Sequence, residues 1–559
     1  MTFNLLSDVE WNFVDSDISA NDKMRLMLDT ILLNFDTAFP VKTSQLKNCN
    51  SHKIVWMTPS LKSMRETLGL ITDAHNLLKT TDLRLLKNTF KRKYNSAIKK
   101  AKVSACDRYI LNNSNNSKAM WNLINKMKPS PKEKENVLNV SPNKLNNFFT
   151  KVAEDIISSL PTSNINPITI MSSVEVKTPQ FVFSEISQII VRDALTSLKN
   201  SYSKDVYGLT TSVIKSVQNI IIPPLTKIFN NCIKECLFPD CLKLATIVPI
   251  YKKRDVNDLN NYRPISLLPI ISKILEKILM IQITEYFCQN NLFDNNQFGF
   301  RKGLTTEKAI LALLNYINNS FIKKENYAAS FLDLKKAFDC VSHEILISKL
   351  YFYNFSPASC KLITSYLTNR TQRVSVNGQI SSDLTLKHGV PQGSILGPIL
   401  FLIYVNDLPY HLSKADVILY ADDTTIGVPF TSQKNQLSFT DQAQDWFLAN
   451  KLSLNKDKTI KLTFTLNHIA SENDVNSTKF LGLSIDSKLL WNEHGVISSK
   501  KISKNVYLLR MLSNTLSENV LKVAYFGLIH SILVYGLLAW GHSSSLQDLL
   551  SCNEKLFVL

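Results

Sequence analysis

Apolar residues recur along this chain with two periods, which predict where helices and strands lie. A spacing of three and four residues predicts helices, and we expect them at residues 7–39, 143–160, 185–198, 271–287 and 308–321. Short runs rich in β-branched residues predict strands, and we expect these at residues 245–251, 327–333 and 417–425. Pro249 predicts an edge position for the first strand, because proline has no backbone N–H to donate.

The order of these segments favours an α+β fold over a doubly wound α/β fold. Strands alternate with long helices, but without the regular repeat of βαβ units. Residues 128–140 and 161–174 are rich in Pro, Ser and Asn and predict linkers. A chain of 559 residues has room for three or four domain-sized units, or for one large core with additions.

Positive charge is concentrated in one part of the chain. Lys and Arg number 64 and Asp and Glu number 46, so the formal net charge is +18. Residues 81–135 hold 14 Lys or Arg against 4 Asp or Glu, so 14 − 4 = +10 of the excess lies there. The run Lys91, Arg92, Lys93 beside Tyr94 fits contact with nucleic-acid phosphates. A solvated helical face explains the same residues equally well.

Neither a zinc site nor a membrane span is predicted. Of the nine cysteines, the closest cluster, Cys232, Cys236 and Cys241, lacks the paired ligand spacing of zinc sites, and we expect these to be buried thiols in a reducing compartment. The longest apolar stretch, residues 523–540, is interrupted by His530 and two glycines and is too short to cross a bilayer comfortably. No signal peptide is recognised, so we expect a soluble protein that does not bind membranes.

Acidic residues lie at or near the ends of two of the predicted strands. Asp333 ends one of them, and Asp422 and Asp423 lie side by side in the other. Adjacent carboxylates raise one pKa unless a cation compensates them. An isolated Asp-Asp pair is often a surface turn, but carboxylates from separate segments suit two-metal phosphoryl transfer, with the ions about 3.5–4 Å apart. We expect Asp333 and Asp422 to share two Mg²⁺ ions, with Asp423 as a secondary ligand.

Together with several further motifs, these segments resemble reverse transcriptases. The central motifs are residues 331–339 (Phe-Leu-Asp-Leu-Lys-Lys-Ala-Phe-Asp), the Gly/Pro loop 389–398 and the Tyr-Ala-Asp-Asp box 420–423. Residues 260–268, 297–301, 452–459 and 480–482 resemble motifs of the non-LTR (LINE-type) retrotransposon branch, above all its jockey-like and CR1-like elements. The resemblance covers about residues 181–490 and weakens on both flanks. It implies an RNA-directed DNA polymerase that uses two Mg²⁺ ions, with Mn²⁺ as a substitute.

The resemblance implies roles for the basic residues around the carboxylates. Lys252, Lys253 and Arg263 match positions that contact the triphosphate, where charge-assisted bonds to phosphate suit them. Lys458 matches a lysine that protonates the leaving pyrophosphate, and it would act as a catalytic general acid. An exposed surface charge is the plain alternative for each lysine.

Three further residues match positions next to the incoming nucleotide. Phe338 matches the steric gate, where a bulky ring excludes a 2′-hydroxyl, although a core aromatic is the plain alternative. Gln392 and Gly393 match the loop that lies against the nascent base pair, where a missing Cβ allows close approach.

The family implies a right-hand polymerase architecture of fingers, palm and thumb with a mostly helical N-terminal extension. We expect a basic extension at 1–135, a linker and helix at 136–180, fingers at 181–325, palm at 326–490 and thumb at 491–559, with the reverse transcriptase domain overall at about 230–490. Full-length relatives begin with an endonuclease, and residues 1–135 resemble the connector that follows it. We therefore expect a truncated polyprotein that lacks the endonuclease domain.

The expected partners are an RNA template, a DNA primer and dNTPs, with an element-encoded RNA-binding protein as a further partner. The sequence does not fix a cellular location, although reverse transcription at a chromosomal nick would need access to the nucleus.

Two alternatives to this function stay open. One is a related enzyme, a group II intron maturase or an RNA-dependent RNA polymerase. The other is a decayed copy that binds nucleic acid and no longer polymerises.

Overall fold

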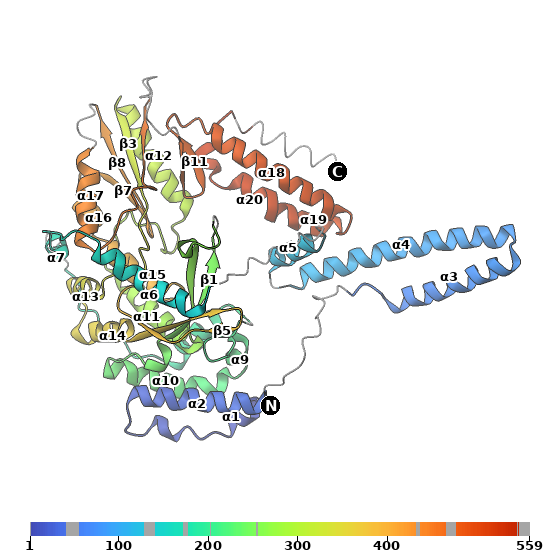
Figure 1. The fold of residues 1–559 in the computed structure, drawn as a ribbon, viewed down its shortest axis with the longest axis horizontal. Helices are drawn as coiled ribbons and strands as arrows, with labels where there is room; N and C mark the ends of the chain where they lie inside the picture. Colours follow the sequence, from blue (N-terminus) through green and yellow to red (C-terminus); the bar gives the residue numbers. More distant parts are fainter. Residues whose placement is uncertain are drawn as a thin grey trace. The chain divides into compact units, whose positions relative to one another are not determined.

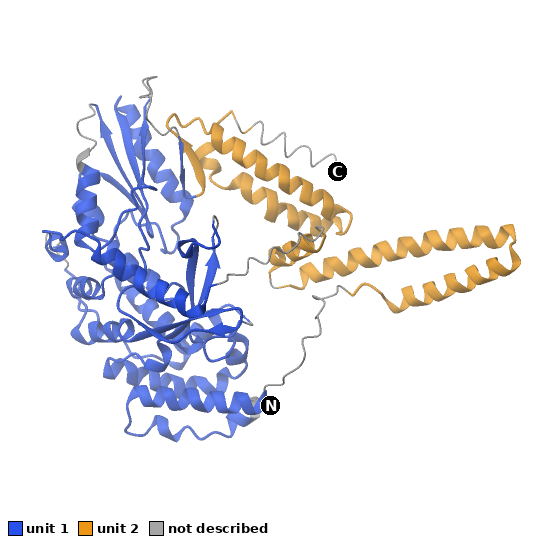
Figure 2. Cartoon of the chain, viewed as in Figure 1, with its two compact units in different colours: residues 1–42, 136–481 blue, residues 43–135, 482–559 orange. Residues whose placement is uncertain are grey.

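Contacts divide the chain into two compact units (Figure 2). Unit 1 consists of residues 1–42 and 136–481, and unit 2 of residues 43–135 and 482–559. The structure, a computed structural model, describes residues 2–40, 55–113, 115–127, 140–171, 177–201, 203–252, 255–431, 437–465, 477–544 and 546.

The first sheet of unit 1 is antiparallel, with four strands in the order β7-β8-β3-β9 (Figure 1). These strands are β3 (Asn326–Leu332), β7 (Asp416–Tyr420), β8 (Asp423–Phe430) and β9 (Ile460–Phe464). Since β3 pairs with both β8 and β9, it occupies an inner position. Helix α12 (Thr306–Ile322) packs against this sheet and contributes its apolar face to the core.

The prediction of one strand at residues 417–425 is wrong. Strand β7 ends at Tyr420 and β8 begins at Asp423, with Ala421 between them at a φ of 59°. Apolar residues continue on both sides of the turn, so the hydrophobic pattern does not reveal it. The predicted strands at 245–251 and 327–333 are confirmed by β1 and β3.

The second sheet of unit 1 mixes parallel and antiparallel pairs. Its order is β2-β1-β4-β5, and β6 also pairs with β4. The strands are β1 (Leu244–Tyr251), β2 (Tyr262–Leu267), β4 (Arg370–Val376), β5 (Gln379–Ile380) and β6 (Leu384–Leu386).

Pro249 does not mark an edge strand, contrary to the prediction. Strand β1 lies between β2 and β4, but its pairing with β4 ends at Ile247. Pro249 therefore lies beyond the reach of β4, opposite Pro264 of β2. Its missing N–H costs no hydrogen bond to β4, so the residue is tolerated in an inner strand.

Helices fill the rest of unit 1 and enclose one large core. The long helices are α8 (Gln188–Ser197), α10 (Gln218–Glu235), α11 (Ile270–Gln289), α13 (His343–Phe352), α14 (Pro357–Leu367), α15 (Gly397–Val405) and α17 (Leu437–Ala449). The shorter elements are α1 (Thr2–Ser7), η1 (Asn12–Val14), α7 (Pro167–Met171), α9 (Thr211–Ser216), η2 (Asp240–Leu242), η3 (Leu259–Asn261), α16 (Leu408–His411) and β10 (Ser477–Phe480). Helix α15 is buried on all sides, with Pro398 its most accessible residue.

Helix α2 (Ala20–Ala38) belongs to unit 1 and packs on α10. Ser19 begins the helix, because its side chain accepts a hydrogen bond from the N–H of Asp22. The carboxylate of Glu235, at the end of α10, accepts the N–H of Ala20 at 2.9 and 3.0 Å. The predicted helix at 7–39 is therefore interrupted before Ser19 and confirmed after it.

Helix α6 (Pro142–Ser158) also belongs to unit 1, where it packs on β4. Leu145 and Phe149 are buried in a small core with Val374 of that strand. The buried Asn146 donates from Nδ2 to the carbonyls of Gln372 at 3.3 Å and Ser382 at 2.8 Å. This helix confirms the prediction at 143–160.

The remaining predicted helices are confirmed by α8, α11 and α12, within three residues at each end. The predicted linker at 161–174 contains the short helix α7. Most of the predicted linker at 128–140 lies outside the described residues.

Unit 2 is mostly helical. Its elements are α3 (Pro59–Leu78), α4 (Thr81–Leu111), α5 (Asn116–Met127), β11 (Leu483–Asp486), α18 (Asn492–Ser513), α19 (Glu518–Tyr525), the π-turn η5 (Phe526–His530), α20 (Ser531–Val534) and α21 (Leu537–Trp540). Helices α3 and α4 lie side by side as a hairpin (Figure 1), which turns at Lys79 with a φ of 49°. Among the described residues, no helix combines the length and apolar character that crossing a membrane requires.

The expected N-terminal extension at 1–135 is divided between the units. Helices α1 and α2 belong to unit 1, whereas α3, α4 and α5 belong to unit 2.

Candidate active site

Strand pairing brings the three predicted carboxylates to the same end of the first sheet. Asp333 directly follows β3, Asp422 lies in the turn from β7 into β8, and Asp423 is the first residue of β8. Leu332, the last residue of β3, pairs with Thr424 of β8. The register therefore places Asp333 beside the acidic turn, as the sequence predicts.

The acidic turn is held by the motif at residues 297–301. The buried Gln297 accepts the N–H of Ala421 at Oε1 and 3.4 Å, and Phe298 donates its N–H to the carbonyl of Leu419 at 2.7 Å. A Cβ on Gly299 would lie 2.4 Å from the backbone nitrogen of Ala421, closer than atoms can approach. Glycine is therefore required where this motif crosses the turn.

Desolvation and, to a smaller extent, mutual repulsion raise the pKa values of the adjacent carboxylates. Burial by surrounding protein, and then the charges of Asp422 and Asp333, raise the pKa of Asp423 to about 6. Burial also raises the pKa of Asp422, and the charge of Asp333 adds to the rise. Solvent still reaches both side chains. This end of the sheet therefore concentrates negative charge that favours a bound cation or proton.

Two polar side chains contact Asp333 directly. Lys458 places Nζ 3.2 Å from Oδ2 of Asp333, and Asn455 donates from Nδ2 to the same oxygen at 3.0 Å. The backbone N–H of Asn455 also donates to the carbonyl of Asp333 at 2.8 Å. The lysine side chain is 59% exposed, so it can move away from the carboxylate.

Positive charge reaches the carboxylates from the second sheet as well. Lys252 follows β1, and Arg263 lies on β2; their charges lower the pKa of Asp422, against the larger effect of burial. Burial lowers the pKa of Lys252, and the neighbouring charge of Arg263 lowers it further. Lys253, the third predicted triphosphate contact, lies outside the described residues.

The Gln392–Gly393 loop lies against β2. Gln392 donates from Nε2 to the carboxylate of Asp339 at 2.8 and 3.0 Å, while its carbonyl accepts the N–H of Ser266 at 2.8 Å. Gly393 has a φ of 124°, and a Cβ there would lie 2.7 Å from the carbonyl oxygen of Ser266. This close backbone approach requires glycine.

Glu276 fixes the far end of this loop and was not predicted from sequence. It is completely buried in α11 and accepts the N–H groups of Ile395 at 2.7 Å and Leu396 at 3.2 Å. Burial raises its pKa, and the charge of Arg370 opposes the rise. In the sequence, a carboxylate within an apolar helix indicates a buried polar contact. The sequence does not reveal which segment that carboxylate binds.

Phe338 is half-buried and stacks on Phe401 of α15, with ring centroids 4.4 Å apart and planes at 25°. Its carbonyl accepts the N–H of Val390, which ties it to the start of the glycine-rich loop. The ring therefore contributes to the core, as the plain alternative expects, and keeps an accessible side.

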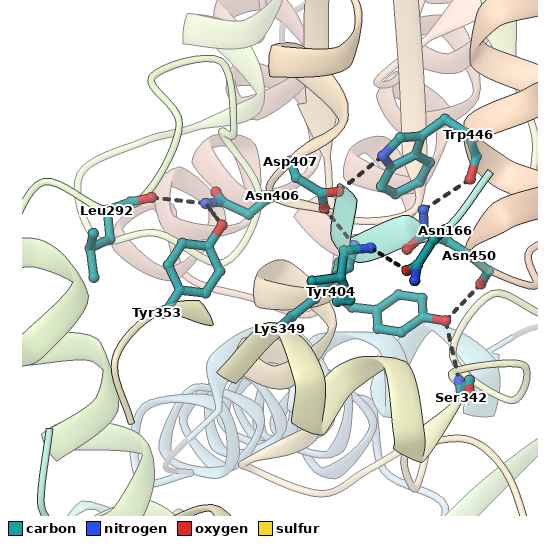
Figure 3. Close-up of polar contacts among 11 residues, drawn as sticks. Asn166, Leu292, Ser342, Lys349, Tyr353, Tyr404, Asn406, Asp407, Trp446 and Asn450 are labelled. Carbon is teal, nitrogen blue, oxygen red and sulfur yellow. Dashed lines mark hydrogen bonds and ion pairs between the residues drawn. The ribbon is translucent and has the colours of Figure 1, made fainter. Parts of the chain in front are cut away.

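A buried ion pair supports α15 from the side of α13 (Figure 3). Lys349 is fully buried and donates from Nζ to Asp407 at 2.5 Å and to the carbonyl of Tyr404 at 2.6 Å. Trp446 donates from Nε1 to the other oxygen of Asp407 at 3.0 Å. Burial lowers the pKa of Lys349, and the charge of Asp407 opposes this change.

The donor set at the sheet end fits divalent metal ions chemically, since three carboxylates from two segments supply hard oxygen ligands. Among the described residues, no group of three or more His, Cys, Asp or Glu side chains is already arranged around a single metal position.

A family described as "Reverse transcriptase (RNA-dependent DNA polymerase)" matches residues 250–485. The chain is similar to "Probable RNA-directed DNA polymerase from transposon BS" of Drosophila melanogaster, with 28% identity over 377 residues, which is 62% of this chain and 41% of the relative. It is also similar to "RNA-directed DNA polymerase from mobile element jockey". The Drosophila melanogaster protein is 27% identical over 461 residues, 76% of this chain and 50% of the relative. The Drosophila funebris protein is 29% identical over 391 residues, 64% of this chain and 42% of the relative. The chain thus spans 41–50% of the length of these relatives.

Proposed function

We propose that this chain, which carries a reverse transcriptase domain related to those of non-LTR transposons, is an RNA-directed DNA polymerase that copies RNA into DNA. One observation carries the proposal. Asp333, Asp422 and Asp423 lie at one end of a sheet, with cations from Lys458, Lys252 and Arg263 around them. The substrates are a primer with a free 3′-hydroxyl, an RNA template and dNTPs.

Reverse transcriptases generally use divalent metal ions. Asp333, Asp422 and Asp423 would hold two Mg²⁺ ions, which would lower the pKa of the attacking hydroxyl and neutralise charge on the leaving pyrophosphate. Mn²⁺ takes the same oxygen ligands and is expected to substitute. The pKa of Asp423, which burial and then the charges of Asp422 and Asp333 raise to about 6, supports this assignment, because a bound cation would stabilise the charged carboxylates.

Three of the basic residues bind the triphosphate, and a fourth protonates the leaving pyrophosphate. Arg263 offers a planar fork for phosphate oxygens, and Lys252 and Lys253 add point charges from the adjoining segment. Lys458 donates a proton to the leaving pyrophosphate. Its contact with Asp333 and its exposed side chain support this role, since the ammonium is close to the metal ligands and free to move.

The apolar and loop residues select the nucleotide. The accessible side of Phe338 excludes a 2′-hydroxyl, while its stack on Phe401 keeps the ring in place. Gln392 and Gly393 lie against the nascent base pair, and the bonds of Gln392 to Asp339 orient that loop.

We assign the fingers to residues 181–325, the palm to 326–490 and the thumb to 491–559. Residues 1–135 form the extension and 136–180 the linker and helix. The carboxylates at the end of the first sheet support the palm assignment, and the proposed phosphate-binding cations of Lys252, which follows β1, and Arg263 on β2 support the fingers assignment.

Primer extension on poly(rA)·oligo(dT) with Mg²⁺ tests the proposal. The purified chain is expected to incorporate dTTP in preference to UTP. Asp422→Asn should abolish incorporation and leave RNA affinity nearly unchanged, because it removes one metal ligand. Asp193→Asn, at an exposed position of α8, serves as the matched control and should be fully active.

Other outcomes would favour the alternatives. RNA binding without any dTTP incorporation would identify a chain that no longer polymerises. Incorporation of UTP in preference to dTTP would identify an RNA polymerase. A large loss of RNA affinity in Asp422→Asn would mean that the aspartate has a structural role.

A further inference from the structure

Helix α4 carries a strong positive charge that its partner in the hairpin lacks. Its sequence holds nine Lys or Arg and two Asp, a net charge of 9 − 2 = +7. Helix α3 holds two Lys or Arg and two Asp or Glu, a net charge of zero. The charge of the hairpin is therefore confined to one of its two helices.

Five of the nine cations of α4 fall on one side of the helix. Arg84, Lys87, Lys91, Asn95, Lys99 and Lys102 follow one another at spacings of three and four residues. These six residues, called the α4 stripe, lie within about a third of the helix circumference and extend for about 27 Å at 1.5 Å per residue. All except the half-buried Lys87 are exposed. The two acidic residues of α4, Asp82 and Asp107, lie outside the stripe.

An aromatic side chain and a hollow lie at the C-terminal end of the stripe. Lys102 places Nζ 4.8 Å from the ring centroid of Trp56, which precedes α3. Trp56, Lys99 and Lys102 line a hollow together with Asn514 and Thr515 from the connection between α18 and α19. The surface therefore combines lysines, a half-buried indole and short polar side chains within unit 2.

Lys99 also lines a second hollow, with Lys100, Val103, Ser104 and Asp107. The carboxylate of Asp107 is engaged, because Oδ1 accepts the N–H of Ser517 at 3.1 Å. It therefore offsets the lysine charges less than a free carboxylate would. Positive charge borders two adjoining concave surfaces at this end of α4.

A phosphodiester backbone fits these features better than other polyanions. Regularly spaced lysines along a rod match phosphates that repeat along a strand. An indole beside lysines offers a stacking surface of the kind that unpaired bases use. An anionic membrane would need exposed large apolar side chains within the same face, whereas Ile98, which falls on this face, is half-buried.

We propose that the α4 stripe, with Trp56 at its end, is an RNA-binding surface made by unit 2 alone. It binds the sugar-phosphate backbone of single-stranded RNA through Lys91, Lys99, Lys102 and Arg84. The surface contains none of the residues assigned to nucleotide transfer. The chain therefore has an RNA-binding site whose affinity does not depend on the three carboxylates.

The test compares two triple variants of the full chain. Lys91→Glu/Lys99→Glu/Lys102→Glu changes the stripe, and Lys62→Glu/Arg65→Glu/Lys79→Glu changes exposed positions of α3 and the hairpin turn. Each lowers the net charge by six, so a difference between them reports position and not total charge. Circular dichroism melting checks that both variants fold. Lys91→Gln/Lys99→Gln/Lys102→Gln provides a milder change if the glutamates disturb the helix.

Fluorescence anisotropy with a labelled single-stranded RNA measures affinity from about 50 to about 200 mM KCl. The stripe variant is expected to bind at least about tenfold more weakly. Its slope of log affinity against log salt should fall by about 2, since each phosphate contact on a single strand contributes about 0.7. The α3 variant should bind within about twofold of the parent.

Three outcomes would overturn the proposal. Equal losses in both variants would show a general charge effect, and unchanged RNA affinity in the stripe variants would show that the surface does not bind RNA. Stripe-dependent binding to phosphatidylserine vesicles without stripe-dependent RNA binding would assign the surface to a membrane. Asp422→Asn is expected to keep stripe-dependent RNA binding, so failure of the polymerase proposal remains distinguishable from failure of this one.

Discussion

Asp423 differs from a surface aspartate because the fold makes its charged form unfavourable. Burial and the charges of Asp422 and Asp333 raise its pKa to about 6. A group whose pKa is raised by folding stabilises the fold below its unfolded pKa, and that contribution is lost as the pH rises to about 6. The metal-free protein is therefore under electrostatic strain at neutral pH, which a bound cation would relieve.

Asp423→Asn should raise the melting temperature of the metal-free protein at pH 7.5 by about 1–4 °C, because asparagine resembles the protonated form. The difference should shrink as the pH falls below about 6. Differential scanning fluorimetry in EDTA measures both effects, with Asp193→Asn as the control. A lower melting temperature at pH 7.5, or a difference independent of pH, would contradict the electrostatic account.

At the residue scale, sequence reasoning found the residues whose chemistry is unusual and missed those that position them. Adjacent carboxylates can be recognised in a sequence, because their mutual repulsion makes a bound cation favourable. Glu276 is an ordinary polar residue in the sequence, and Gln297 lies in a recognised motif whose role the sequence does not give. Only tertiary contacts reveal that Glu276 holds the glycine-rich loop and that Gln297 holds the acidic turn. Roles that depend on nucleotide contacts, such as the gate at Phe338, stay predictions.

At the scale of elements, the ion pair between Lys349 and Asp407 joins α13 to the segment after α15. Both side chains are almost inaccessible, at 0% and 2%. Because α15 continues directly from the glycine-rich loop, this pair also limits how that loop can move. A buried charge that loses its partner is much more costly than the pair itself.

Lys349→Met should lower the free energy of unfolding by about 3–5 kcal/mol, because it leaves Asp407 buried without a cation. The double variant Lys349→Met/Asp407→Leu should recover most of that loss, since no unpaired charge remains. Lys522→Met breaks the exposed pair with Glu518 and should change stability little. Urea unfolding measures all three. A double variant no more stable than the single one would show that packing, and not charge, dominates.

Strong periodicity explains which elements could be predicted. Helices α11 and α12 follow their apolar spacing closely, because long helices contain several turns of the same pattern. The turn between β7 and β8 has no such signal, since its positive φ at Ala421 depends on the contact with Gln297 and Gly299. The edge position predicted from Pro249 is wrong for a related reason. The length of the neighbouring strand β4, which the sequence does not reveal, decides whether a proline is tolerated in an inner strand.

At the scale of the whole molecule, the core of unit 1 extends well beyond the residues that match the reverse transcriptase family. Helix α2 buries Met24 and Met27 in the large core, and α6 buries Leu145 and Phe149 beside the second sheet. Both helices precede residue 250, where the match begins. Unit 1 therefore depends on segments that motif reasoning alone would leave out.

A fragment of residues 177–481 should melt at least about 5 °C below residues 1–42 joined to 136–481 by a flexible Gly/Ser linker. The shorter fragment exposes the apolar surface that α2 and α6 cover, whereas the joined fragment keeps both helices. Circular dichroism and light scattering would report melting and aggregation. Equal melting temperatures would show that the two helices contribute no net stability.

The hydrogen bonds between Ala20 and Glu235 join residues that are 215 positions apart. On the ribosome, α2 is synthesised well before α10, the helix it packs against. At about 5–20 residues per second, this delay is about 10–40 s. During that time the apolar face of α2 has no native cover in the nascent chain. Expression conditions that slow translation should therefore increase its demand for chaperones.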